Sequence, residues 1–77
     1  MTIQENIRKE LLVRLSEGEY LMNKYEESPA EFAERDKRIL YRLQIEIELL
    51  IKLYDDNYDE LDDDTWELAD KITLAEV

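Results

Sequence analysis

Apolar residues recur at helical spacing along the first part of this chain. Six of them fall on one face of a helix: Ile3, Ile7, Leu11, Leu15, Met22 and Tyr25. Residues three or four apart share a face of an α-helix, so this spacing predicts a helix over about residues 3–26. Thr2 and Glu5 have the spacing of a capping box, which favours a helix start at this point.

Gly18 falls on the same apolar face, and it is the only Gly in the chain. One interpretation is a break in the helix near residues 17–19. The other is a close crossing, at which the missing side chain lets a second helix approach. A helix interior tolerates one Gly at a cost of about 1 kcal/mol, so we expect the crossing.

The connection after this helix is marked by the only Pro in the chain. Ser28 suits an N-cap, Pro29 suits the first helical position, and Glu31 completes a second capping box. The residue before a Pro resists helical geometry, so we expect the first helix to end near residues 26–27. A connection this short predicts an antiparallel hairpin, with a second helix over about residues 29–55.

The second predicted helix carries two rows of apolar residues. The first row is a seam with alternating steps of three and four: Leu40, Leu43, Ile47, Leu50 and Tyr54. The second, which we call the apolar row, has steps of four on nearly the opposite side: Tyr41, Ile45, Leu49 and Leu53. A helix that is apolar on two sides needs neighbours on both. We expect the first helix to cover the seam. A third helix or a second copy would then cover the apolar row, and we predict a homodimeric four-helix bundle through it.

A short third helix is predicted over about residues 65–75, after an acidic connection at residues 56–64. Asp64 is placed to cap it, and Glu67 follows three positions later. Trp66, Ala69 and Ile72 form a small apolar stripe. The predicted fold is therefore all-α, with residues 1–77 as a single helical domain.

Charge is concentrated near the end of the chain. Residues 55–77 hold ten acids and one base, whereas the whole chain has a net charge of −11. Nine of these acids lie between Asp55 and Asp70 with no Lys or Arg among them. One interpretation is a solvated segment that confers solubility. The other is an acidic surface that steers and binds a basic protein. Its predicted members are Asp55, Asp56, Asp59, Glu60, Asp62, Asp63, Asp64, Trp66 and Glu67.

A calcium loop is a third interpretation of the acidic segment. Asp55, Asn57 and Asp59 match the first ligand positions of an EF-hand, but Glu60 stands where the loop needs Gly, and Trp66 where it needs Glu. We therefore expect no specific calcium site, and no cofactor. A disordered acidic tail is a fourth interpretation, but the large apolar residues among the acids favour partial order or ordering on binding.

The composition excludes several classes of function. The chain has no His and no Cys, and it lacks a Gly-rich phosphate loop, so we expect no enzyme. No apolar run approaches the roughly 20 residues of a membrane span, and we expect a soluble cytoplasmic protein. A basic cluster, Arg35, Lys37, Arg38 and Arg42, is interleaved with acids. We expect it to pair with carboxylates and not with nucleic acid.

Two functional classes remain. The first is a small acidic module that occupies a basic surface, as a nucleic-acid mimic or an inhibitor of a nucleic-acid-binding protein. Small acidic helical inhibitors of phage and mobile-element origin, and immunity proteins, offer an analogy of size and charge. The second class is an oligomerising helical adaptor, in which the acidic segment only confers solubility.

Overall fold

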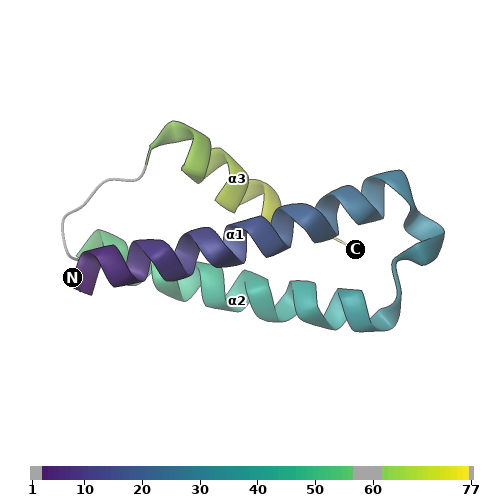
Figure 1. Ribbon diagram of the computed structural model, residues 1–77, viewed down its shortest axis with the longest axis horizontal. Coiled ribbons are helices and arrows are strands. Elements are labelled where there is room, and N and C mark those ends of the chain that lie inside the picture. The colour runs from purple at the N-terminus through teal and green to yellow at the C-terminus, as the bar shows by residue number, and fades with distance from the viewer. Residues whose placement is uncertain (1–2, 57–61, 77) are drawn as a thin grey trace.

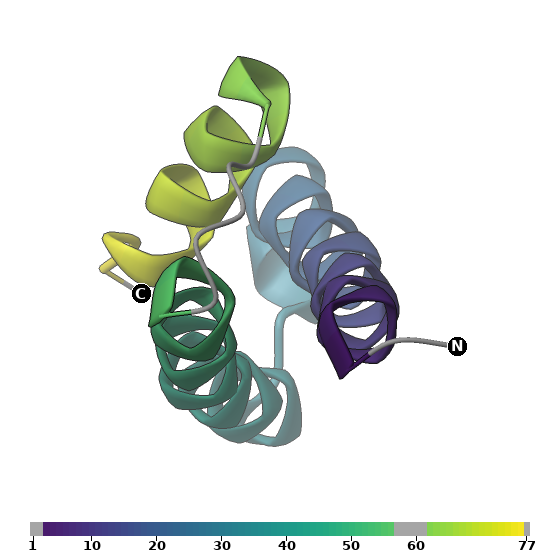
Figure 2. The same cartoon turned by 90° about the vertical axis from the view of Figure 1, so that its left-hand side faces the viewer.

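The computed structural model describes residues 3–56 and 62–76, and every regular element in these residues is helical. The elements are α1 (Ile3–Glu27), the 3₁₀ turn η1 (Pro29–Glu31), α2 (Glu34–Asp56) and α3 (Asp63–Thr73). α1 and α2 form an antiparallel hairpin, and α3 packs against both (Figure 1). Viewed along the hairpin, the three helices form a triangle, with α3 on one side of the α1–α2 pair (Figure 2). The all-α prediction is confirmed.

The core lies between the three helices. Its largest fully buried side chains come from every helix: Leu11, Leu15, Leu40, Leu43, Ile47 and Ile72. The predicted seam of α2 and most of the predicted face of α1 therefore point inward. Sequence reasoning missed Leu21, which is only 4% exposed. Within the described residues, none of the helices combines the length and apolarity that a bilayer crossing requires.

The connection differs from the prediction, because α2 begins at Glu34 and not at Pro29. Ser28 makes no side-chain capping bond. Backbone bonds close a separate turn instead, from Glu31 N to the Ser28 carbonyl at 2.9 Å and from Phe32 N to the Pro29 carbonyl at 3.2 Å. Phe32 then adopts extended backbone geometry, and its ring packs edge-on against Tyr25 with centroids 5.2 Å apart. The contact between these two rings favours leaving the helical path.

Asp36 explains where α2 begins. Its Oδ2 accepts a hydrogen bond from the backbone N–H of Ala33 at 3.1 Å, just before the first residue of the helix. A carboxylate at the third helical position that reaches back in this way is half of a capping box. Asp36, which falls on the seam side upstream of Leu40, is therefore the start signal of α2.

The start of α3 is also corrected. Asp62, and not Asp64, is the N-cap, since its Oδ1 accepts from the backbone N–H of Thr65 at 2.8 Å. The backbone of Asp62 is extended (φ −70°, ψ 162°), as the N-cap position requires, whereas Asp64 already lies in the first turn. The helix therefore begins two residues earlier than predicted, and it ends at Thr73.

Candidate acidic interface

The candidate site is the outward side of α3. Four carboxylates project there, and all four side chains are exposed; we call Asp63, Asp64, Glu67 and Asp70 the acidic face. Ala69 and Ile72, on the opposite side of the helix, are completely buried. The acidic face is therefore carried by a helix whose other side is fixed in the core.

Gln44 of α2 fixes the end of α3. Its Nε2 donates to the carbonyls of Ile72 and Ala75, at 3.0 Å in each case. Ile72 lies in the last turn of α3 and Ala75 lies just beyond it, so this side chain ties the end of α3 to α2. α3 is consequently held at both ends, by Asp62 at the start and by Gln44 at the finish.

The cap at Asp62 has an electrostatic signature. Hydrogen bonds from Thr65, through its side chain and its backbone N–H, lower the pKa of the Asp62 carboxyl, and the positive charge of Arg8 acts in the same direction. Asp62 is therefore engaged in holding the helix. Among the predicted partner-binding acids it has a structural task, unlike the members of the acidic face.

Within the described residues, no Lys or Arg forms an ion pair with the acidic face. Lys71 is the only base among residues 55–77, and its Nζ lies 3.7 Å from Glu26 Oε1 of α1. The charge of the acidic face thus remains available to solvent or to a partner.

The other predicted members of the acidic surface are distributed differently. Trp66 is half-buried and packs against the core, so part of its ring already serves the fold. Asp59 and Glu60 lie outside the described residues, as does much of the segment that was compared with a calcium loop and rejected. Asp55 and Asp56 belong to the last turn of α2, and their side chains also lie outside the description. The described residues contain no group of three acids placed to hold a metal ion.

The apolar row lies exposed on α2. Its side chains retain large exposed fractions: Tyr41 43%, Ile45 61%, Leu49 58% and Leu53 49%. The third helix does not cover them, because α3 docks on the side of α2 that carries Gln44. The sequence left two possible covers for this row, α3 and a second copy of the chain. The structure excludes α3.

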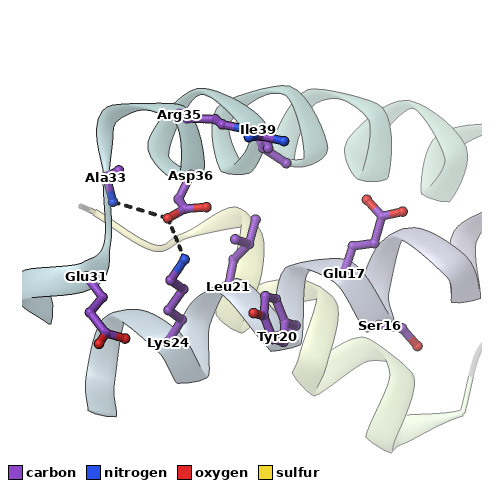
Figure 3. Close-up of a pocket in the computed structure, with 10 residues that line it drawn as sticks. All are labelled: Ser16, Glu17, Tyr20, Leu21, Lys24, Glu31, Ala33, Arg35, Asp36 and Ile39. Atoms are coloured by element: carbon purple, nitrogen blue, oxygen red, sulfur yellow. Dashed lines mark hydrogen bonds and ion pairs between the residues drawn. The ribbon is translucent and has the colours of Figure 1, made fainter. Parts of the chain in front are cut away.

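Sequence reasoning missed an open hollow between α1 and α2, beside the η1 turn (Figure 3). The volume of this hollow is about 720 Å³. Lys24 and Asp36 bridge the two helices at its edge, with Nζ 2.9 Å from Oδ2. The hydrogen bond from Lys24, together with the Ala33 N–H, lowers the pKa of Asp36, and the same bond raises the pKa of Lys24. The start signal at Asp36 and the base on the facing helix were the sequence features that could have revealed this bridge.

The predicted pairing of the basic cluster is only partly seen. Arg42 Nε lies 3.5 Å from Glu46 Oε1 on the same helix, and Arg14 of α1 approaches Glu46 Oε2 at 3.6 Å. Arg14 also donates to Glu10 at 2.7 Å, and this bond is the main reason for its raised pKa. Partly exposed ion pairs therefore form within and between the helices of the hairpin, and each of them stabilises it only modestly.

Comparison with protein-family models, curated proteins and solved structures finds no match for this chain. We therefore infer a function from the geometry and charge of the residues described above.

Proposed function

We propose that this protein is a non-enzymatic binding module whose acidic face docks on the basic surface of another protein. The observation that carries the proposal is the set of exposed carboxylates on α3, none of which is ion-paired within the described residues. Unpaired charges on a fixed helix attract an oppositely charged partner over long range and raise the rate of association.

The spacing of the charges favours a nucleic-acid-binding protein as the partner. The four carboxylates of the acidic face lie within residues 63–70. At a helical rise of about 1.5 Å per residue they give roughly one charge per 3 Å, close to the roughly 3.4 Å of a single nucleic-acid strand. A groove that accepts a phosphate backbone would therefore meet a similar density of negative charge on α3. We propose that the module acts as a mimic of this kind, and so as an inhibitor.

The experiment neutralises the acidic face and leaves its scaffold intact. The variant is D63N/D64N/E67Q/D70N, in which Asp62 is kept because it caps α3. A matched control, E27Q/E31Q/E34Q/E48Q, removes the same number of exposed charges from other parts of the chain. Both variants should keep the helical circular dichroism spectrum of the parent.

The readout is quantitative capture from a cell lysate at low and at high salt. We expect the parent and the control to retain a basic nucleic-acid-binding protein at low salt, and the face-neutralised variant to lose it. Added nucleic acid should compete for the captured protein. If the two variants lose capture equally, total charge and not the acidic face is responsible, and the proposal is wrong.

A second candidate function is an oligomerising adaptor, and the exposed apolar row favours it. Two hairpins that meet through this row would form the predicted four-helix bundle. In that case the acidic face would only confer charge, and capture of a partner would survive its neutralisation. The substitutions I45E and L49E would abolish capture instead.

A further inference from the structure

The apolar row is an exposed surface on the side of α2 opposite the buried seam. Ile45 and Leu49, at its centre, are the most exposed of its members at 61% and 58%. The seam on the other side of α2 is buried, with Leu43 and Ile47 at 1% and 0%. α3 joins α2 through Gln44, so the row faces away from α3 and from the acidic face.

The charges around the apolar row differ from those of the whole chain. α2 holds five bases and six acids, so it is close to neutral in a chain of net charge −11. A strongly charged partner would find no matching field on this surface. If a second copy packs its α2 against the α2 of the first, the two acidic faces stay apart and their like-charge repulsion is avoided.

The charges of α2 are also ordered along its length. Residues 34–45 hold four bases and two acids, a net charge of +2. Residues 46–56 hold one base and four acids, a net charge of −3, and the last turn has no base. Two parallel α2 helices would place bases beside bases and acids beside acids. Two antiparallel helices would place the basic half of each beside the acidic end of the other, where the helix dipole adds negative charge.

We propose that the apolar row is covered by the same row of a second copy in antiparallel orientation, an inference that rests on the self-association proposed above. Ile45 then lies opposite the partner's Leu49, and Tyr41 lies opposite the partner's Leu53. In this register Arg38 is level with the end of the partner's α2. The contact is isologous, so each residue pair occurs twice and the assembly closes as a dimer.

The area of this contact predicts reversible association. α2 has 23 residues. A helix of that length is about 34 Å long and about 11 Å wide, which gives roughly 750 Å² for the two copies together before side-chain relief is counted. This lies at the low end for specific interfaces, where complexes are transient. The dimer should therefore form and dissociate with concentration.

The dimer has a functional consequence for the acidic face. The apolar row and α3 lie on different sides of α2, so pairing through the row leaves both acidic faces outward. The assembly would present two acidic faces to a partner that itself has two basic surfaces. Binding of both would strengthen the complex without any new type of contact.

Cysteine cross-linking tests the register, because the chain contains no Cys of its own. Y41C and L53C are made as separate variants with different affinity tags and are then mixed and oxidised. Tyr41 and Leu53 are separated by about 18 Å along the helix at 1.5 Å per residue, so a disulfide can form only where the two positions meet. Antiparallel pairing predicts a disulfide between the two variants and little within either one.

Other results would overturn the proposal. Disulfides within each variant would show parallel pairing, and equal amounts of all products would show non-specific collision. Sedimentation of the unmodified chain is measured alongside. A monomer at every concentration would reject self-association. The capture experiment above would still test, independently, whether the acidic face binds a partner.

A control variant distinguishes loss of the proposed interface from repulsion caused by added charge in general. I45E/L49E is expected to abolish the dimer, whereas V13E/L74E adds the same charge at two exposed apolar positions outside the row and should leave it intact. Circular dichroism checks that both variants remain folded. Equal dissociation by the two variants would contradict an interface at the apolar row.

Discussion

Gly18 of α1 and Ile72 of α3 meet where the two helices cross. A Cβ on Gly18 would lie 2.7 Å from Cδ1 of Ile72, 3.0 Å from its Cγ2 and 3.1 Å from its Cγ1. The space that a side chain would need at position 18 is therefore filled by Ile72. α1 is helical through this point, so the crossing predicted from the sequence is confirmed and the break is wrong.

Substitution of Gly18 by Ala should destabilise the protein. Ala improves helix propensity by about 1 kcal/mol, but overpacking a filled site costs about 1–3 kcal/mol. We expect a net loss of up to about 2 kcal/mol in the free energy of unfolding, measured by urea denaturation. Trp66 is the only Trp, so its fluorescence reports on α3 directly.

The matched partner of this change is Ile72→Val, which removes Cδ1. Alone it should cost about 0.5–1.5 kcal/mol, as deletion of one buried methyl group usually does. Combined with Gly18→Ala, it should cost less than the sum of the two single changes, because the shortest contact is gone. Additive effects would mean that the two residues do not limit each other.

The bridge between Lys24 and Asp36 predicts a loss of stability in acid. The pKa of Asp36 is lowered from its ordinary value of 3.8 in the folded state. Its contribution is therefore fully present above that value and is lost as the pH falls through the lower folded value. Thermal unfolding followed between neutral pH and about pH 2 should show this decline.

Two variants separate the charge of Asp36 from its capping role. Asp36→Asn keeps an oxygen that can accept from the Ala33 N–H but loses the charge, whereas Asp36→Ala loses both. We expect the Tm at neutral pH to fall in the order parent, Asn, Ala. The acid-side decline should also be shallower in the Asn variant, and a residual decline is expected from Asp62, whose pKa is lowered as well. An unchanged acid profile in the Asn variant would argue against the bridge.

The cap at Asp62 predicts that its removal loosens α3. Asp62→Ala loses the acceptor for the Thr65 N–H and should lower the Tm by roughly 4–8 °C, the usual effect of a lost cap in a small domain. Asn is as good an N-cap as Asp, so Asp62→Asn should retain most of the stability. Asp64→Ala, by contrast, should have little effect, since Asp64 is not the cap.

Gln44 predicts that a residue of α2 controls the end of α3. Gln44→Leu removes two hydrogen bonds and should cost roughly 1–3 kcal/mol in the free energy of unfolding. Gln44→Glu is nearly isosteric but brings a carboxylate to two carbonyls, so it should be worse than Leu at neutral pH and should recover in acid. If Leu is the more damaging of the two at neutral pH, the hydrogen bonds from Gln44 to the end of α3 are not formed.

Much of the fold follows from the sequence because helical periodicity is a local property. The spacing of Leu40, Leu43 and Ile47 identifies the buried side of α2 wherever its neighbours lie. The Ser28–Pro29 step likewise fixes where α1 must end, since the restriction acts between adjacent residues. The acidic character of the last third is a matter of composition alone.

Only the tertiary structure decided which carboxylates form the acidic face and which apolar surface of α2 remains exposed. Both depend on the side of the hairpin to which α3 docks, and that side is set by the fit of Ile72 against Gly18 and by the reach of Gln44. The bridge between Lys24 and Asp36 is similar, because its two residues lie on different helices. Periodicity along one helix specifies what must be buried, whereas the choice of neighbour depends on steric fit and hydrogen bonds between elements.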